Sequence, residues 1–531
     1  MSELIRILVT DPLAEEGIHL LQVENHVKVD VKTKLKQEEL LSLIGEYDGL
    51  VVRSGTQVTK EVLEKAKRLK VIGRAGAGLD NIDVESASKK GIIVMNAAAG
   101  NTISTAEHTM ALLLSLTRNV PQACVTLKGG MWDRSSFMGV ELYGKHLGII
   151  GLGKVGTEVA KRALSFGMRL LIYDPYLSVE KARELDATPV EKLEEIYQKA
   201  DYITVHTPLT DETKDLIGAK EFAMMKKGVR IINCARGGII DEKALVEAIK
   251  SGKVAGAALD VFEQEPPTNK ELIALPQVIV TPHLGASTEE AQRNVATEIA
   301  VSVRDYLLGR GIRNAVNVPC VDPEALKLLD PYLKLIERMG LMQAQLMEGR
   351  IQGVQLRYVG EVTRLDVAPL TIAFLKGFLT PVLQESVNYV NAPMIAKERG
   401  IKVLETKATE VQDFANLIVT IVETDRMKLE IHGTLYTRSD PRIVRINEFY
   451  VDAVPSGSML VVRNQDKPGM IGMIGTALGT RGINIGWMTL GRTKPGGDAL
   501  VVINVDQPIS SEILAEIKKL PLVLDAKHIK L

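Results

Sequence analysis

Short apolar runs alternate with amphipathic, helix-like stretches over the first three hundred residues of the chain. In the first hundred, the apolar runs lie at residues 5–10, 47–54, 70–78 and 91–96. After a long segment with helical spacing at 102–130, a second series lies at residues 146–151, 169–174, 201–208, 229–235, 254–260 and 278–283. Buried-type strands separated by helices are typical of βαβ units, so both series predict parallel sheets in an α/β fold.

The pattern changes in the second half of the chain. A helical segment at 287–309 and a proline-bearing linker at 314–325 precede the change. Three runs at 414–424, 428–437 and 442–454 read as antiparallel strands. The remaining segments follow a βαββαβ order. The prediction is four units, made of residues 1–98 with 292–317, residues 99–291, residues 318–454 and residues 455–531.

Charge and cysteine content exclude several classes of protein. Lysine and arginine total 65 against 66 aspartates and glutamates, a net charge of −1 that gives no field to attract nucleic acid or an anionic membrane. Cys124, Cys234 and Cys320 are too few and too widely spaced for a disulfide framework or a metal site. No apolar run reaches the roughly 18 residues of a membrane helix. We expect a soluble cytoplasmic protein.

A glycine-rich turn follows the strand predicted at 146–151. Gly151, Gly153 and Gly156 have GxGxxG spacing and stand at the start of a helix. The first allows a tight turn, the second lets the backbone approach a pyrophosphate, and the third lets helix and strand pack closely. Asp174 ends the next strand, where a carboxylate can bond a ribose 2′-hydroxyl and repel a 2′-phosphate. The pattern predicts a dinucleotide site that prefers NAD over NADP.

Three charged or titratable residues follow strands of the second series. Arg236, Glu265 and His283 stand in "NCARGG", "DVFEQEPP" and "VTPHLGAST". The carboxyl ends of strands in an open α/β sheet line the ligand crevice. Hydride transfer from a secondary alcohol needs a base for the hydroxyl proton and a cation for a nearby carboxylate. His283 suits the first task and Arg236 the second, and Glu265 would fix the histidine tautomer and raise its pKa.

Three residues near these motifs are interpreted as packing or cofactor-contact residues and not as catalytic ones. Nothing basic in sequence accompanies Cys234, so a small core or cofactor-contact role is favoured over a nucleophile. His206 is interpreted as a histidine packed beneath the cofactor. Asp260, at the end of "AGAALD", could help to hold the cofactor.

The motifs together resemble a known family. "GRAGAGLDNID", "LGIIGLGKVG", "VHTPLTDET", "NCARGGIIDE", "ALDVFEQEPP" and "TPHLGASTEEAQ" are similar to those of the D-isomer-specific 2-hydroxyacid dehydrogenases, in particular the phosphoglycerate dehydrogenase branch. The resemblance spans the first 317 residues. It implies that a Rossmann-type NAD domain is inserted in a flavodoxin-like substrate domain and that Arg236, Glu265 and His283 are catalytic. It also implies cofactor contacts from Lys154, Val155, Asp174, Thr207, Cys234, Asp260 and Gly285.

The resemblance also implies a substrate. It points to oxidation of 3-phospho-D-glycerate to 3-phosphohydroxypyruvate, the first step of phosphorylated serine synthesis. The phosphate needs cations, for which Arg53 and Arg134 are the candidates, and Ser54 and Gly76 are expected beside the substrate.

The C-terminal half supports the same branch. Residues 318–452 resemble an α+β intervening domain with a possible allosteric substrate site, and the last segment resembles an ACT domain. An amino-acid effector at an interface of paired ACT domains would contact Asn464, Asp466 and Asn484. The resemblance implies a homodimer or homotetramer, with no nucleic-acid, membrane or metal partner. Whether serine is the effector is left open.

Two alternatives stay open at this point. The same chemistry could act on another acid, such as glyoxylate or hydroxypyruvate. A different class is an NAD-sensing binding protein, since corepressors of this fold use cofactor occupancy to control assembly.

Overall fold

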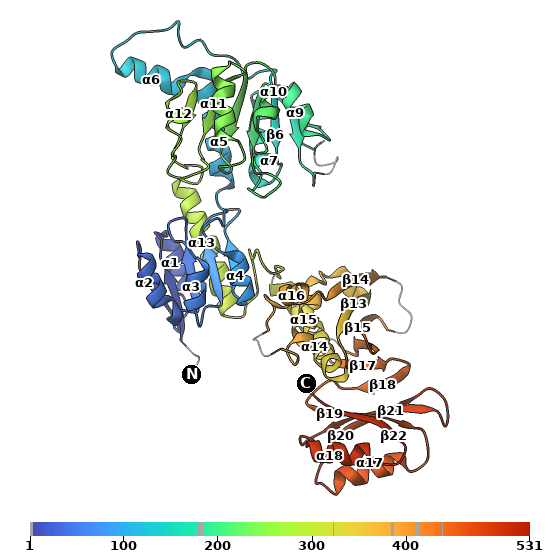
Figure 1. The fold of residues 1–531 in the computed structure, drawn as a ribbon. Helices are drawn as coiled ribbons and strands as arrows, with labels where there is room; N and C mark the ends of the chain where they lie inside the picture. The colour runs from blue at the N-terminus through green and yellow to red at the C-terminus, as the bar shows by residue number, and fades with distance from the viewer. Residues whose placement is uncertain are drawn as a thin grey trace.

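The computed structural model describes residues 4–177, 182, 184–321, 323–383, 387–409, 414–437 and 439–531. Figure 1 shows four sheet-containing units in chain order, with the first and second stacked along one direction and the third and fourth extending from the first. Two of the sheets are parallel, and the other two are mixed and antiparallel. The predicted α/β class, with two further α+β regions, is confirmed.

The first unit is a five-stranded parallel sheet in the order β2-β1-β3-β4-β5. Its elements are β1 (Ile5–Val9), α1 (Glu15–Leu21), β2 (Val27–Val31), α2 (Gln37–Leu43), η1 (Ile44–Glu46), β3 (Gly49–Val52), α3 (Lys60–Lys65), β4 (Val71–Arg74), α4 (Val84–Lys89) and β5 (Ile93–Asn96). The hydrophobic pattern missed β2 because this edge strand alternates lysine and aspartate with valine and has no fully buried residue.

The second unit is a seven-stranded parallel sheet in the order β12-β11-β10-β9-β6-β7-β8. Its strands are β6 (His146–Ile150), β7 (Arg169–Tyr173), β8 (Thr188–Pro189), β9 (Tyr202–Val205), β10 (Val229–Asn233), β11 (Val254–Leu259) and β12 (Val278–Val280). Its helices are α5 (Thr102–Arg118), α6 (Val120–Lys128), α7 (Lys154–Ser165), α9 (Leu193–Lys199), α10 (Ala219–Met224), α11 (Glu242–Lys250) and α12 (Lys270–Ala274).

The predicted helical segment at 102–130 is divided in two. Asn119 has a left-handed backbone with φ of 53°, which ends α5, and Pro121 lies in the first turn of α6. α6 has no buried residue, so it projects from the unit, as Figure 1 shows at the top of the molecule. The break turns one expected helix into a core helix followed by an exposed arm.

The chain crosses between the first two units twice. It first passes from β5 to α5, and it returns through α13 (Glu289–Leu307). α13 packs against α1 and the sheet of the first unit, where Gly17 and Gly73 leave no room for a side chain between them and the helix. Ile299 and Val303 of α13 are fully buried in the core of that unit. The helix therefore follows the second unit along the chain but packs as part of the first unit.

The third and fourth units carry the antiparallel strands. The third contains α14 (Pro323–Leu346), β13 (Ile351–Gly360), η2 (Glu361–Arg364), α15 (Ala368–Leu379), α16 (Ala392–Glu398), β14 (Lys402–Ala408), β15 (Asn416–Thr424), β16 (Lys428–Leu435), β17 (Pro441–Ile446) and β18 (Phe449–Ala453). The fourth contains β19 (Ser458–Gln465), α17 (Met470–Gly479), β20 (Ile485–Arg492), β21 (Asp498–Val505), α18 (Ser511–Lys518) and β22 (Val523–Lys530), in the predicted βαββαβ order. The third sheet has six strands, and the run at 442–454 forms two of them around a turn at Asn447.

The sheet of the second unit decides where the chemistry lies. Strands β9 to β12 are parallel neighbours, so the loops that follow them all leave at one edge of the sheet. The loops after β10, β11 and β12 carry Arg236, Glu265 and His283. This edge faces the first unit, as the lining of the cavities between them shows.

Candidate active site

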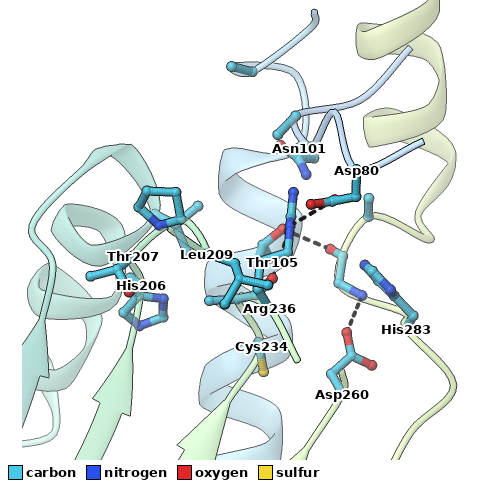
Figure 2. Close-up of a pocket in the computed structure, with 18 of the residues that line it drawn as sticks. Asp80, Asn101, Thr105, His206, Thr207, Leu209, Cys234, Arg236, Asp260 and His283 are labelled. Atoms are coloured by element: carbon cyan, nitrogen blue, oxygen red, sulfur yellow. Dashed lines mark hydrogen bonds and ion pairs between the residues drawn. The ribbon is translucent and has the colours of Figure 1, made fainter. Parts of the chain in front are cut away.

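Two adjoining cavities lie between the first and second units. Cavity A, of about 510 Å³, is lined by the loops after β9, β10, β11 and β12, by the start of α5 and by residues 77–80 of the first unit. Cavity B, of about 570 Å³, extends towards the loops of the first unit. Asp80, Asn101, Arg236 and His283 line both cavities. The predicted catalytic arginine and histidine thus stand at the junction between the two spaces (Figure 2).

The glycine turn has the geometry that its spacing predicts. Gly151 has φ of 92°, and a side chain there would meet the His206 carbonyl oxygen at 2.8 Å. A side chain on Gly156 would collide with the Gly151 carbonyl, whereas one on Gly153 would meet no atom within 4 Å. The open space at Gly153 adjoins the first turn of α7, where free amide groups attract a phosphate. These observations fit a bound dinucleotide.

Asp174 accepts hydrogen bonds from two backbone amides, one of them in the glycine turn. Its Oδ2 accepts a hydrogen bond from the Leu152 amide at 2.7 Å, and Oδ1 accepts one from the Tyr176 amide at 2.8 Å. The carboxylate therefore ties the end of β7 to the glycine turn.

The other predicted cofactor residues divide into two groups. Five of them line cavity A, namely Val155, Thr207, Cys234, Asp260 and Gly285. Lys154 begins α7 and is not part of that lining. The hydroxyl of Thr207 is buried and has no hydrogen-bond partner among the described residues, so it is free to bond a ligand in cavity A.

Two residues of cavity A are held uncharged. Burial raises the pKa of the Cys234 thiol to about 12, which removes any nucleophilic thiolate at neutral pH. Burial lowers the pKa of His206 to about 4, and its Nε2 lies 3.0 Å from the Thr204 hydroxyl. Both environments agree with the interpretation of these side chains as neutral contacts.

His283 and Glu265 form a direct pair. The Nδ1 atom of His283 lies 2.8 Å from Oε2 of Glu265, and the other glutamate oxygen accepts the Phe262 amide at 3.3 Å. The pair is partly exposed, with 48% of the histidine side chain accessible to solvent. With Nδ1 donating to the glutamate, the lone pair of the neutral ring stands on Nε2. The arrangement leaves a proton acceptor at the junction of the cavities.

Arg236 faces the first unit across the cleft. Its Nε lies 3.3 Å from Oδ2 of Asp80, and its terminal nitrogen donates to the Ala235 carbonyl at 2.7 Å. A side chain on Gly78 would collide with the guanidinium, so this glycine makes the room that Arg236 occupies. Asp80 is 67% exposed, and an ion pair this open to solvent is weak. Another carboxylate can therefore take its place.

Three of the four predicted substrate residues lie together in one cavity, and the fourth does not. Arg53, Ser54 and Gly76 line cavity B. Arg134 does not line either cavity and lies exposed in the segment that follows α6. Within one chain, α6 and the segment after it carry Arg134 away from the cleft, so its expected role at the substrate phosphate stays a prediction.

Sequence reasoning missed a second arginine in cavity B. Arg74 ends β4, and its Nε is buried with no hydrogen-bond partner among the described residues. Burial first, and then the nearby positive charge of Arg236, lower the pKa of Arg74 to about 10. A buried cation without a bonded carboxylate is costly, and an anionic ligand would relieve that cost. In the sequence, "GRAGAG" places this arginine at the end of a predicted strand, and no local feature distinguishes it from an ordinary strand residue.

The predicted effector residues have mostly local partners. Asp466 accepts hydrogen bonds from Arg492 at 3.0 Å and from the Gly496 amide at 3.1 Å, and Asn484 donates to Asp506 at 2.6 Å. Asn464 is almost fully buried, and its Oδ1 has no partner among the described residues.

A third cavity, of about 490 Å³, lies on the sheet of the third unit. Arg357, Lys407, His432 and Arg445 line it. Burial lowers the pKa of His432 despite its contact with Glu430. Within the described ranges, no group of side chains could hold a metal ion, and no helix has the length and hydropathy needed to cross a bilayer.

Comparison with known proteins agrees with this geometry. Residues 110–285 match the model of the D-isomer specific 2-hydroxyacid dehydrogenase NAD binding domain. The chain is therefore an NAD-dependent enzyme of the D-2-hydroxyacid dehydrogenase class. Residues 328–447 match the D-3-phosphoglycerate dehydrogenase intervening domain, and residues 458–522 match the ACT domain.

Relatives that match nearly the whole chain show to which family within this class of dehydrogenases it belongs. D-3-phosphoglycerate dehydrogenase of Methanocaldococcus jannaschii is 46% identical over 99% of this chain and all of its own, and that of Bacillus subtilis is 42% identical over the same shares. The chain belongs to the D-3-phosphoglycerate dehydrogenase family.

Solved structures match somewhat more than half of the chain. A Thermus thermophilus protein superposes with a TM-score of 0.55 at 34% identity, covering 59% of this chain and all of its own. D-lactate dehydrogenase of Aquifex aeolicus, solved with NAD and lactic acid, superposes with a TM-score of 0.52 at 29% identity, covering 57% of this chain and 96% of its own. These two matches cover little more than half of the chain, a share consistent with the dehydrogenase units alone.

The glycine turn generates a prediction that separates packing from ligand approach. Gly156→Ala should lower the melting temperature of the ligand-free protein by several degrees, because the new methyl collides with the Gly151 carbonyl. Gly153→Ala should leave that temperature unchanged, yet weaken NADH binding by roughly tenfold or more, because only the ligand needs its space.

The two variants are measured by thermal unfolding and by titration of NADH fluorescence. Gly472→Ala, in α17, is the control, because a side chain there would also meet no atom within 4 Å and this glycine has no positive φ. Normal NADH affinity in Gly153→Ala would contradict the assignment of this turn to the cofactor.

Proposed function

We propose that the protein oxidises 3-phospho-D-glycerate to 3-phosphohydroxypyruvate with NAD, the first step of phosphorylated serine synthesis. The observation that carries the proposal is the junction of cavities A and B. It joins the His283 and Glu265 pair and Arg236 to Val155 beside the glycine turn on one side, and on the other to Arg74, whose buried Nε has no partner among the described residues. A cofactor in cavity A and a phosphorylated acid in cavity B would meet at His283.

The proposed reaction breaks a C–H bond and an O–H bond of the substrate, and the hydride and the proton go to two different acceptors. Bound NAD would supply the acceptor for the hydride from carbon 2 of the substrate. His283 takes the hydroxyl proton on Nε2, and the carbonyl forms from the electrons of the O–H bond. Glu265 holds Nδ1–H in place and stabilises the imidazolium that results, as a carboxylate does for a catalytic histidine.

Arg236 is the proposed holder of the substrate carboxylate. A guanidinium can bond both oxygens of a carboxylate in one plane, which fixes the neighbouring hydroxyl towards His283. Asp80 is the present partner of Arg236 at 3.3 Å. The substrate would exchange with this exposed aspartate.

Arg53 and Arg74 are the proposed holders of the phosphate. Both line cavity B beside Ser54 and Gly76. The Arg53 guanidinium donates only to the Pro12 carbonyl at 3.2 Å among the described residues, so it is bound to no carboxylate. Two such cations favour an acid with a phosphate over glyoxylate or hydroxypyruvate, which lack one. They also favour an enzyme over an NAD-sensing binding protein, since sensing needs no cation at the far end of the cleft.

The proposed assembly is a homodimer or homotetramer that forms through the arm made by α6 and residues 129–143. The arm exposes Val125 at 71%, Trp132 at 78% and Met138 at 85% of their surfaces. A cluster of this kind is typical of an interface. Arg134 lies on the arm, so it keeps a substrate role only where the arm of a second copy brings it to a cleft.

The proposed regulation lies in the C-terminal units. An amino-acid effector is expected between paired ACT domains, and the buried, unpartnered Oδ1 of Asn464 is the polar atom that favours this prediction most. The basic cavity of the third unit favours the expected second anion site. The cytoplasm stays the proposed location.

Removing the base should stop the reaction. His283→Ala should lower kcat by about 10²- to 10⁴-fold, the usual contribution of a positioned acid or base. The measurement is NADH oxidation with 3-phosphohydroxypyruvate, alongside the dissociation constant of NADH, which should change little. His19→Ala, on the surface of α1, is the matched control. Near-normal turnover of His283→Ala would remove the proposed base.

Removing the cation in cavity B should change substrate preference. Arg74→Ala should lower kcat/KM for 3-phosphohydroxypyruvate by roughly 10- to 100-fold, the worth of hydrogen bonds to a charged group. For hydroxypyruvate, which lacks the phosphate, kcat/KM should change much less. Arg293→Ala, at an exposed pair with Glu16, is the control. An equal loss on both substrates would place Arg74 outside phosphate recognition.

Charging the arm should dissociate the assembly. The double variant Trp132→Glu with Met138→Glu should shift sedimentation from an oligomer to a monomer, because burying two new carboxylates is unfavourable. Tyr176→Glu, 97% exposed in the same unit but away from the arm, should leave the oligomer intact. A wild-type protein that sediments as a monomer contradicts the proposed assembly.

A further inference from the structure

The segment 281–285, here called the catalytic turn, packs against one face of α5 and is held there by hydrogen bonds. The Ser104 hydroxyl donates to the Gly285 carbonyl at 2.7 Å, and the Thr105 hydroxyl lies 3.2 Å from the same oxygen. One helical turn further along, Nε2 of His108 lies 3.1 Å from Oδ1 of Asp260 and 3.1 Å from the Thr281 hydroxyl. Residues at these spacings share a helix face, so the turn rests on three side chains of α5.

Asp260 is the centre of this contact. Its Oδ1 accepts the Thr281 hydroxyl at 2.6 Å and the Leu284 amide at 2.7 Å, and its Oδ2 accepts the Gly285 amide at 2.8 Å. Figure 2 shows Asp260 and Thr105 on either side of the segment that carries His283. Burial alone would raise the pKa of Asp260, but hydrogen bonds from His108 and Thr281 outweigh it and keep the carboxyl charged. A buried carboxylate with four donors fixes the backbone on both sides of His283.

The hydrogen bonds also show that Nε2 of His108 carries a proton. The Thr281 hydroxyl donates to Asp260, so it can only accept from its other neighbour. The carboxylate accepts as well. Both partners of His108 Nε2 are therefore acceptors, and the ring must carry its proton there.

His283 needs this support because its own conformation is unfavourable. Its φ is 56°, in the left-handed region that L residues adopt at a cost of about 1–3 kcal/mol. Nearly half of its side chain is exposed, and Glu265 is its only side-chain partner among the described residues. The backbone position of the catalytic turn therefore decides where Nε2 of His283 lies.

We propose that His108 is a positioning residue, which acts through Asp260 to hold the catalytic turn so that His283 meets the substrate, while Ser104 and Thr105 hold the same turn at the Gly285 carbonyl. The inference rests on the proposed function, in which His283 is the base. His108 touches neither substrate nor the reacting atoms. Its effect is on the placement of another side chain, and a shift of about 1 Å at a reacting group can cost up to about 10²-fold in rate.

The test compares two replacements of His108. Leucine fills similar space but donates no hydrogen bond, whereas the glutamine side-chain nitrogen can reach the place of Nε2. His108→Leu should lower kcat for 3-phosphohydroxypyruvate reduction by roughly tenfold, with changes of no more than about threefold in the substrate KM and the NADH dissociation constant. His108→Gln should recover at least about a third of wild-type kcat, because it restores the donor.

A double-mutant cycle shows whether His108 acts through His283. In a His283→Ala background, His108→Leu should cause no more than about a twofold further loss, because the group it positions is gone. A full additional tenfold loss in that background would overturn the proposal, as would His108→Gln as slow as His108→Leu. His146→Leu is the control, since this histidine begins β6 and so lies at the amino end of its strand, away from the carboxyl ends that carry the site.

The cycle also separates this inference from the proposed function. If His283→Ala turns over normally, the proposed base and the positioning role both fail. If His283→Ala loses activity and His108→Leu does not, only the positioning role fails. Should His108→Leu not fold, Ser104→Ala removes a single oxygen from the same contact and should lower kcat by about threefold or more, with unchanged NADH affinity. Unchanged kcat in Ser104→Ala would then overturn the proposal.

Discussion

Parallel pairing of β9, β10, β11 and β12 is the constraint on which the active site depends. Because these neighbouring strands run in one direction, every loop that follows them leaves at the same edge of the sheet. Residues separated by up to 47 positions, Arg236 and His283, are brought to one cleft without any local sequence relation between them. The first unit then closes the other side of the cleft, because α13 returns the chain to it.

The sequence predicted this edge well, because strand ends and glycine turns leave strong local signals. Gly151, Gly153 and Gly156 and the residues after each strand could all be identified from spacing. Arg74 could not be separated from an ordinary strand residue, because its importance comes from burial without a partner. Asp80 and His108 are defined by contacts with Arg236 and Asp260, distant in the chain, which spacing does not express.

The helical segment at 102–130 marks a different limit of sequence reasoning. Its apolar spacing continues through Asn119, so the pattern alone predicts one continuous helix. The left-handed backbone at Asn119 ends that helix, and the apolar residues beyond it face solvent instead of the core. Hydrophobic spacing shows that these residues are to be covered, but it does not show which part of the protein or of a partner covers them.

The ion pair between Arg236 and Asp80 joins the two units that enclose the cleft. Asp80 belongs to the same chain, so its effective concentration at the guanidinium is set by geometry and does not vary with the supply of substrate. Under the proposed function, Asp80 is a built-in competitor of the substrate carboxylate for Arg236. On the same proposal, a substrate carboxylate that displaces Asp80 would also release a link between the first and second units, so that binding in the cleft and movement of those units would be coupled through one exposed aspartate.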